Sequence, residues 1–297
     1  MLSQHLKNKY NREFLKSTPA YLGYNLSWLR SVAQNLDGIQ SGLYLIAAET
    51  NMGKTTLMTN LFIDLLHSNH ELQGIYFSFD DNKDVIINRF LAFLTGIDIN
   101  RIQAPNMLSE SIHSMLVTSG YGRLTEWADS GKINIQDMND VKNFDELQEM
   151  IKTMDPSRLV VCIDGTYNLA VEGANFGMRE ENIIRANKLK LLVDTYRIPL
   201  FATVELRKKD TKNLHAPPTH HDIMESSKFA YNAHVIFILY PELRSALEDS
   251  KLIIHYEKNK LSAFKGKTTL YFLKNISRLI EEQDWVSAQK VMYALGS

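Results

Sequence analysis

The sequence predicts an α/β protein whose sheet is mostly parallel, with helices on both faces and antiparallel strands at one edge. Two observations predict this fold. From Gly42 onward, apolar runs with the length of buried strands alternate with longer stretches of helical periodicity, an order typical of parallel sheets. Three apolar runs near the carboxyl end follow one another more closely, which indicates antiparallel strands. A length of 297 residues and a hydrophobic fraction of 44% suit one large globular domain.

The elements follow one another in a regular order along the chain. Strands buried on both faces are predicted at residues 43–48, 74–79, 159–164 and 198–205. Helices are predicted at residues 55–67, 83–96 and 181–196, where apolar side chains recur at helical spacing. The antiparallel strands are predicted at residues 235–240, 251–258 and 268–273. The first two strands each lead through a short loop into a helix, which is the connection that a parallel sheet requires.

The chain divides into a linker helix at residues 1–20, a core at residues 21–280 and a helical tail at residues 281–297. An apolar stripe on the linker helix packs either on its own domain or on a neighbouring subunit. No apolar run approaches the ~20 residues of a membrane span, and the first residues lack the apolar core of a signal peptide. We therefore expect a cytoplasmic protein with no membrane partner. The single cysteine, Cys162, excludes an intramolecular disulfide.

The most specific motif is the run AETNMGKTT, which follows the first predicted strand and opens a helix. It ends in the Gly-Lys-Thr of a Walker A phosphate loop. Backbone N–H groups at the helix start bind the β-phosphate, Lys54 reaches the β- and γ-phosphates, and the Thr55 hydroxyl is a ligand of Mg²⁺. The sequence therefore predicts that ATP and Mg²⁺ bind here. The predicted nucleotide contacts are Ala48, Asn51, Met52, Gly53, Lys54, Thr55 and Thr56.

A second motif has the pattern of a Walker B strand. The run LVVCID ends in Asp164, and a carboxylate at that position holds the Mg²⁺ shell in phosphate-loop proteins. Many apolar strands end in Asp, so the motif gains its meaning from following the phosphate loop in the expected chain order. Thr55 and Asp164 are the predicted metal ligands.

These motifs resemble the RecA-like motor domain of the DnaB-type replicative hexameric helicases of phages, plasmids and bacteria. The resemblance runs from about residue 20 to residue 275. The run AAETNMGKTT is similar to the family's AARPSMGKT, and GIYFSFDD is similar to its strand ending in S-L-E. LFATVELRK resembles the strand followed by S-Q-L-N-R, and HYEKNK resembles the K-x-R segment that reaches the neighbouring subunit's ATP. The resemblance implies a RecA-like P-loop NTPase.

The resemblance also implies a function. We expect a ring-forming DNA helicase or translocase that acts on single-stranded DNA and hydrolyses Mg-ATP at its subunit interfaces. The assembly would be a homo-oligomer, a hexamer in this family, with a primase or a helicase loader as a further partner. Helicases of this type usually carry a sizeable N-terminal domain, whereas residues 1–20 alone precede the motor here. We therefore expect a free-standing version or a truncated form.

Three catalytic positions depart from the family pattern. Asp80 stands where the family has its catalytic Glu, with Asp81 as a second candidate, and Glu205 stands where it has a sensor Gln. The resemblance places Lys258 and Lys260 in the finger segment, where Lys260 replaces an Arg and loses its bidentate fork. Each departure lowers the expected turnover. A second function therefore stays open, that of a nucleotide-switched RecA-like assembly or regulatory factor with weak or no unwinding activity.

Two loops are the candidates for holding DNA, because in this family the corresponding loops face the ring channel. They are residues 171–182 and 206–218. Contacts of this kind to the phosphate backbone are independent of base sequence and sensitive to salt. The alternative is a pair of solvated loops, because the formal net charge is −1 and gives no overall attraction to nucleic acid. The predicted DNA contacts are Arg179, Arg207, Lys208, Lys209 and Lys212.

Overall fold

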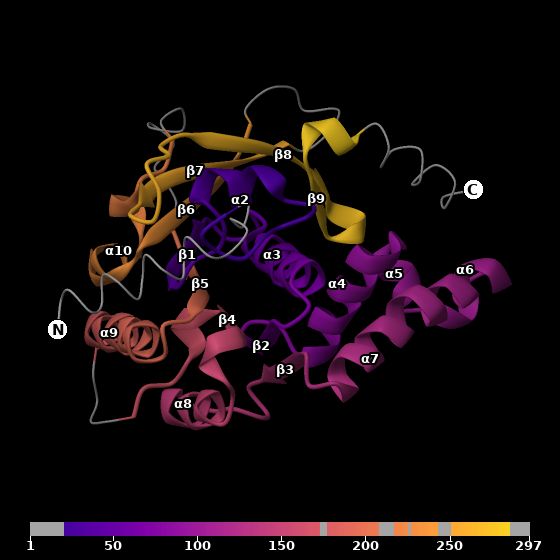
Figure 1. Ribbon diagram of the computed structural model, residues 1–297, viewed down its shortest axis with the longest axis horizontal. Helices are drawn as coiled ribbons and strands as arrows, with labels where there is room; N and C mark the ends of the chain where they lie inside the picture. Colours follow the sequence, from indigo (N-terminus) through magenta and orange to yellow (C-terminus); the bar gives the residue numbers. More distant parts are fainter. Residues whose placement is uncertain (1–20, 173–176, 208–216, 225–226, 243–250, 286–297) are drawn as a thin grey trace, which may run out of the picture.

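The computed structural model describes residues 21–172, 177–207, 217–224, 227–242 and 251–285. In these ranges a nine-stranded sheet has the order β3-β2-β4-β5-β1-β6-β7-β8-β9 (Figure 1). The pairings from β3 to β6 are parallel, and those from β6 to β9 are antiparallel. The predicted fold class is therefore confirmed. The strands are β1 (Gly42–Ala48), β2 (Gln73–Ser78), β3 (Ile133–Asp137), β4 (Leu159–Asp164), β5 (Pro199–Glu205), β6 (Val235–Pro241), β7 (Lys251–Asn259), β8 (Lys267–Leu273) and β9 (Arg278–Ile280).

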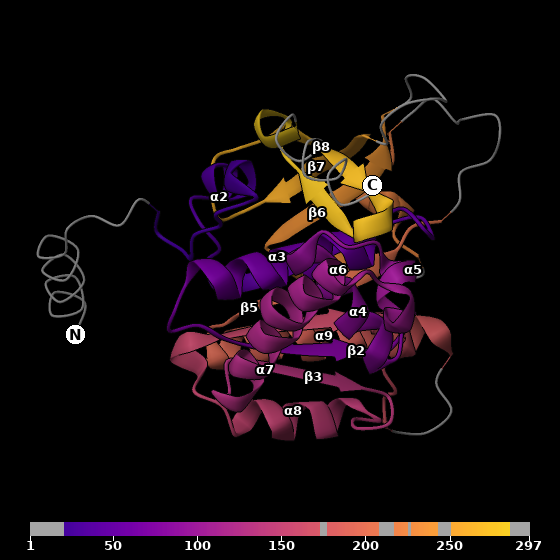
Figure 2. The ribbon, with the colours of Figure 1, turned by 90° about the vertical axis from the view of Figure 1, so that its right-hand side faces the viewer.

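Helices cover both faces of the sheet, which accounts for the nearly continuous apolar sequence of its central strands (Figure 2). One face carries α2 (Arg30–Leu36), α3 (Lys54–Ser68) and α4 (Lys83–Thr95), with α5 (Ile99–Ile102), α6 (Glu110–Met115) and α7 (Gly122–Asp129) packed outside them. The other face carries α8 (Phe144–Lys152), α9 (Met178–Tyr196) and α10 (Ser227–Asn232). The helices predicted from periodicity are α3, α4 and α9, and each lies within a few residues of its expected bounds.

The core between the sheet and α3 is packed around aromatic side chains. The rings of Phe62 and Tyr76 meet edge to face at 5.5 Å, and Phe90 completes the cluster. Gly74 is required beside them, because a Cβ at this position would lie 2.5 Å from the Phe62 ring. These contacts hold α3 against the strands, and the first turn of α3 carries the phosphate loop.

Polar side chains of α3 attach the two ends of the described chain to this helix. The carboxylate of Asp64 accepts backbone N–H bonds from Ser27, Trp28 and Leu29 at 2.8 to 3.0 Å. On the same helix, Asn60 donates to the carbonyl of Ser277 at 2.8 Å and accepts from the N–H of Leu279 in β9 at 2.7 Å. Both side chains are buried, so these bonds are shielded from competing water. The position of α3 is therefore coupled to the segment before α2 and to β9.

The predicted linker helix at residues 1–20 lies outside the described residues, as does most of the predicted tail, of which residues 281–285 are described. One boundary was wrong. Residues 171–182 were predicted as a loop, but α9 begins at Met178, so Arg179 lies in the first turn of a helix. The two acidic residues of that turn, Glu180 and Glu181, favour a helix start because they interact with the positive end of the helix dipole. In the described ranges no helix is both long and apolar enough to cross a bilayer.

Candidate nucleotide-binding site

The phosphate loop joins β1 to α3, and its backbone leaves the helix start open to an anion. Asn51 and Gly53 have left-handed backbone angles, with φ of 64° and 86°. Gly53 is the residue before the helix, and no side chain caps the first turn of α3. The N–H groups of that turn therefore have no side-chain acceptor, and they lie at the positive end of a 15-residue helix. This is the arrangement that phosphate groups bind.

The ammonium group of Lys54 is buried beneath this loop, with only 8% of the residue exposed. Its Nζ donates to the carbonyl oxygens of Ala48 at 3.3 Å and Glu49 at 3.2 Å. It also forms an ion pair with Oε1 of Glu205 at 2.7 Å. The alternative that Glu205 merely ends a strand at the surface is therefore wrong. Ala48 and Glu205 are level in the parallel pairing of β1 with β5, which brings the two groups together.

Asp164 ends β4 and is buried at 1% exposure. Its carboxylate accepts hydrogen bonds from Thr203 at 2.9 Å, from Tyr76 at 3.0 Å and from the hydroxyl of Thr55. Burial raises the pKa of Asp164, and the three hydroxyl donors oppose that shift. The Walker A hydroxyl and the Walker B carboxylate, which the sequence predicted as metal ligands, are thus in direct contact.

The oxygen atoms of Thr55 and Asp164 suit Mg²⁺, which prefers hard oxygen ligands. Mg²⁺ is commonly held by one or two protein groups, with phosphate oxygens and water as its other ligands. Among the described residues no cluster of three or more His, Cys, Asp or Glu side chains is placed to hold a metal ion alone. The donor set therefore fits a cation that arrives with a phosphate ligand.

Asp80 follows β2 and is exposed on the same edge of the sheet. Its Oδ1 accepts a hydrogen bond from Asn168 at 2.5 Å. Partial burial of the carboxylate, together with the charges of Asp164 and Glu205, raises the pKa of Asp80. Gly165 is required here, because a Cβ on it would lie 2.8 Å from the Asp80 backbone nitrogen. The second candidate, Asp81, forms an ion pair with Arg89 at 3.5 Å and is held by α4 instead.

The adjacent strands β2, β4, β5 and β1 bring these residues together at their carboxyl ends. Sequence reasoning predicted the charged groups but missed the supporting residues Tyr76, Asn168 and Thr203. Thr203 gave a usable signal, because it is a hydroxyl inside the otherwise apolar run of β5. Asn168 gave none, since it lies in a short turn far from any motif.

Lys258 and Lys260 lie elsewhere. Lys258 pairs with Ile236 at the amino-terminal end of β6, and the N–H of Lys260 donates to the carbonyl of His234. They are therefore near the opposite end of the parallel strands from their own phosphate loop. Lys258 donates to the carbonyls of Ala230 and Tyr231 in α10, at 2.5 and 3.0 Å, so it caps that helix. Burial and the nearby charge of Lys260 lower the pKa of Lys258 to about 8. Lys260 itself is exposed.

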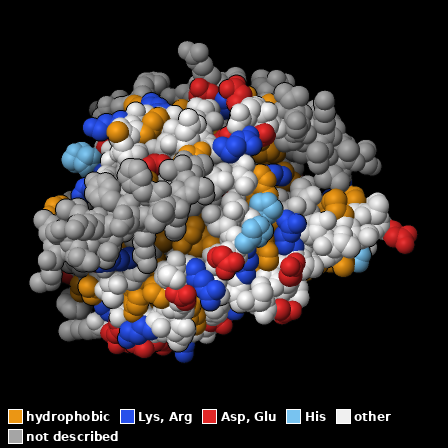
Figure 3. Space-filling model, in the orientation of Figure 1, with side chains coloured by type: hydrophobic (Ala, Val, Ile, Leu, Met, Phe, Trp, Pro, Cys, Tyr) orange, Lys and Arg blue, Asp and Glu red, His pale blue; other side chains and the backbone are white. Residues whose placement is uncertain are grey.

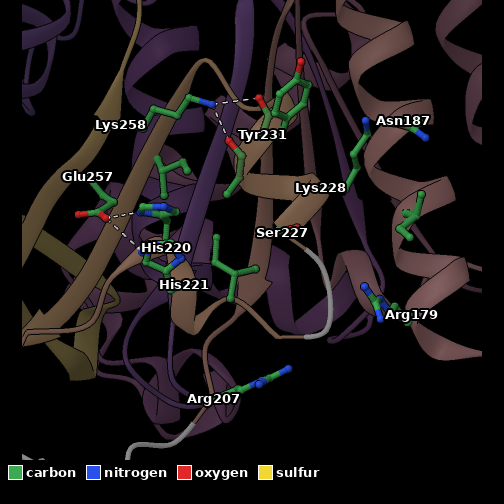
Figure 4. A pocket seen from close by; sticks show the side chains of 14 residues that line it. Arg179, Asn187, Arg207, His220, His221, Ser227, Lys228, Tyr231, Glu257 and Lys258 are labelled. Atoms are coloured by element: carbon green, nitrogen blue, oxygen red, sulfur yellow. Dashed lines mark hydrogen bonds and ion pairs between the residues drawn. The ribbon is translucent and has the colours of Figure 1, made fainter.

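A basic pocket of about 1030 Å³ lies between α9, α10 and the start of β7 (Figure 4). Arg179 of α9 and Arg207, which follows β5, both line it, so two of the predicted DNA contacts share one cavity. Lys228 lies over the ring of Tyr231 at 4.8 Å, and 73% of that tyrosine is exposed. The one acidic side chain in the lining, Glu257, is paired with His220 at 2.5 Å. Lys208, Lys209 and Lys212 lie outside the described residues.

The pocket contrasts with the surface on the face seen in Figure 3. There, Lys and Arg side chains are dispersed among acidic ones and form no single basic patch. This dispersion agrees with the formal net charge of −1. The basic side chains of the pocket are therefore a local feature.

Comparison with known families identifies the chain. The family model of the DnaB-like helicase C-terminal domain matches residues 27–281. The chain belongs to this family. Membership of the DnaB-like family makes the chain an NTP-hydrolysing domain of the helicase class, and it confirms the resemblance seen in the sequence. A search of curated proteins finds no match.

Solved structures confirm the RecA-like fold of this DnaB-like domain. A protein solved as its ATPase domain superposes with a TM-score of 0.81 at 17% identity, and the match covers 95% of this chain and 98% of that one. A DnaB-like replicative helicase, solved in a study of its interactions with primase, gives 0.79 at 17% identity, covering 94% and 66%. A KaiC-like protein of Pyrococcus horikoshii gives 0.55 at 12% identity, covering 81% and 89%. At these identities the likeness concerns the fold.

Proposed function

We propose that this chain is the motor of a ring-forming ATPase that translocates along single-stranded DNA and unwinds duplexes. The observation that carries the proposal is the convergence of Lys54, Thr55, Asp80 and Asp164 on one edge of the sheet. A cation, a hydroxyl and two carboxylates are the groups that magnesium-dependent phosphoryl transfer requires. The substrate is ATP, and the products are ADP and phosphate.

Each residue has a distinct role in the proposed reaction. The helix start and Lys54 hold the β- and γ-phosphates, and Thr55 and Asp164 hold the Mg²⁺. The bound cation neutralises charge on the phosphates. Asp80 orients the attacking water and accepts its proton, a role that its raised pKa favours. Asn168 fixes the direction of the Asp80 carboxylate. The remaining loop contacts are Ala48, Asn51, Met52, Gly53 and Thr56.

We further propose that the site is completed by a neighbouring subunit in a homo-oligomer, a hexamer by analogy with the family. Lys260 supports this proposal, because it is exposed and lies near the far end of the strands from its own phosphate loop. A cation placed there serves a second copy more readily than its own site. Lys258 is the weaker candidate, since two carbonyls of α10 already hold it. A primase or a helicase loader is a further proposed partner.

Replacing the proposed finger is expected to separate ATP binding from hydrolysis. Lys260→Ala should bind ATP with nearly normal affinity but hydrolyse it about a hundredfold more slowly, because charge developing on the phosphates goes unmatched. Mixing this variant with Lys54→Ala should restore activity, since one interface then pairs an intact loop with an intact finger. Steady-state ATPase assays on the single variants and on the mixtures measure both effects.

Lys258→Ala serves as the matched control for this prediction. It removes the cap of α10, so it should lower the midpoint of thermal unfolding more than Lys260→Ala does. Mixtures that assemble together but remain inactive would show that the finger does not act across an interface. A Lys260→Ala variant with normal turnover would remove the role from this residue.

The basic pocket is the proposed surface for single-stranded DNA. Its cations suit phosphate groups, and an exposed tyrosine suits a stacked base. Replacing Arg179, Arg207 and Lys228 with Ala should weaken binding to every sequence and flatten the dependence on salt, because fewer counterions are released. Fluorescence anisotropy with a labelled oligonucleotide at several salt concentrations measures both. The same variant should lose the stimulation of ATP hydrolysis by DNA.

A triple variant of Lys208, Lys209 and Lys212 tests the adjoining predicted contacts separately. If both triple variants keep the wild-type affinity and salt slope, DNA is bound elsewhere or not at all. The nucleotide-switched assembly factor would then be the better function, and the departures at Asp80, Glu205 and Lys260 favour it. ATP-dependent assembly without any effect of DNA on hydrolysis distinguishes that function from a motor.

A further inference from the structure

The lysine of the phosphate loop has no hydrogen-bond donor left for a phosphate. A lysine ammonium carries three N–H donors. Those of Lys54 are directed to the carbonyl oxygens of Ala48 and Glu49 and to the carboxylate of Glu205. A phosphate oxygen that binds Lys54 must therefore replace one of these three acceptors.

Glu205 is the acceptor that is free to leave. The carbonyl of Ala48 is fixed, because it ends β1 and also accepts the N–H of Leu206 at 3.0 Å. The carbonyl of Glu49 belongs to the backbone of the same loop. The carboxylate of Glu205, by contrast, is on a side chain with rotatable bonds that is 28% exposed. Its second oxygen is held only by the exposed hydroxyl of Thr50, at 3.3 Å.

A displaced Glu205 would still repel a phosphate. It ends β5 level with Ala48, so its carboxylate remains beside the loop after it releases Lys54. Its charge also acts on Asp80, which shows that these acidic groups share one field. The γ-phosphate adds negative charge to the group that must enter this field. A diphosphate brings less charge and relies more on the backbone N–H groups of the loop.

We propose that Glu205 sets the preference of this site between nucleoside triphosphates and diphosphates, by competing with the γ-phosphate for Lys54. The inference rests on the proposed nucleotide binding at the phosphate loop. Once the γ-phosphate has been released, Glu205 re-forms its ion pair with Lys54. The chain therefore favours the diphosphate-bound and nucleotide-free states, and the triphosphate binds at the expense of that ion pair.

Removing only the charge of Glu205 tests this competition. Glu205→Gln keeps the length of the side chain and leaves an oxygen that accepts from Lys54. The dissociation constant for Mg-ATP should fall by about tenfold, whereas that for Mg-ADP should change by less than about threefold. Isothermal titration calorimetry on the full chain measures both constants. The readout is their ratio, so it does not depend on the rate of hydrolysis.

Glu49→Gln is the matched control. It makes the same change of charge within the loop, but Glu49 contacts Lys54 only through its backbone carbonyl. Its ratio of ATP to ADP affinity should stay within about twofold of wild type. Equal shifts of the ratio in Glu49→Gln and Glu205→Gln would overturn the proposal, because general charge would then explain the effect.

The remaining outcomes are also decisive. If Glu205→Gln is unstable in thermal unfolding, Glu205→Ala removes the same charge and the same ratio is measured. A wild-type chain that binds both nucleotides, with a ratio unchanged in the Glu205 variant that folds, overturns the inference and leaves the proposed function standing. A wild-type chain that binds neither nucleotide overturns both.

Discussion

Lys54→Ala is expected to lower the affinity for ATP and ADP by about a hundredfold or more, because it removes the only cation that touches the loop in the described chain. The fold should survive. The variant leaves Glu205 without its partner, but that side chain is 28% exposed and can turn to water. Calorimetric titration with Mg-ATP measures the loss, and thermal unfolding shows that the domain is intact.

Lys190→Ala is the control for this experiment. Lys190 is an α9 lysine whose partner is the exposed Asp194 on the same helix, so removing it changes the net charge equally without touching the loop. It should bind nucleotide as the wild type does. If Lys54→Ala binds ATP as tightly as Lys190→Ala does, the assignment of residues 48–56 as a phosphate loop is wrong.

Asp80→Asn is expected to separate binding from hydrolysis. The change removes the charge that accepts a proton from water, while the remaining oxygen can still accept the hydrogen bond from Asn168. Affinity for ATP should stay near that of the wild type, and the rate of hydrolysis should fall by about a hundredfold or more. Single-turnover hydrolysis of labelled ATP measures the chemical step apart from product release.

Asp81→Asn decides whether the correct carboxylate has been chosen. Asp81 pairs with Arg89 on α4, so its loss should disturb a surface contact and leave hydrolysis within about threefold of wild type. An inactive Asp81→Asn variant beside an active Asp80→Asn variant would show that the alignment at this strand is one residue out.

The order of strands and helices was predictable because the period of each buried element is visible in the sequence. The run of β1 is apolar at every position, and α3 repeats its apolar face over four turns. The phosphate loop was equally readable, since its function requires one residue type at each of several adjacent positions. Asp164 followed from its place at the end of an apolar strand.

Other features depend on pairings that no local pattern records. Glu205 and Lys54 are far apart in sequence and meet only because β1 and β5 are adjacent and in register. The cap that Lys258 places on α10 arises from the antiparallel pairing of β6 with β7. The early start of α9 was missed because the polar side chains of its first turn resemble those of a loop.

The bonds made by Asp64 and Asn60 have a mechanical consequence. Residues 27–29 and β9 are attached to α3 at two points along its length, so the helix cannot shift without moving both. Residues 27–29 lie close to the predicted linker helix, and β9 lies close to the predicted tail. Any displacement of α3 on binding or releasing phosphate is thus transmitted to both ends of the domain, and tension applied at either end acts back on the helix that begins at Lys54.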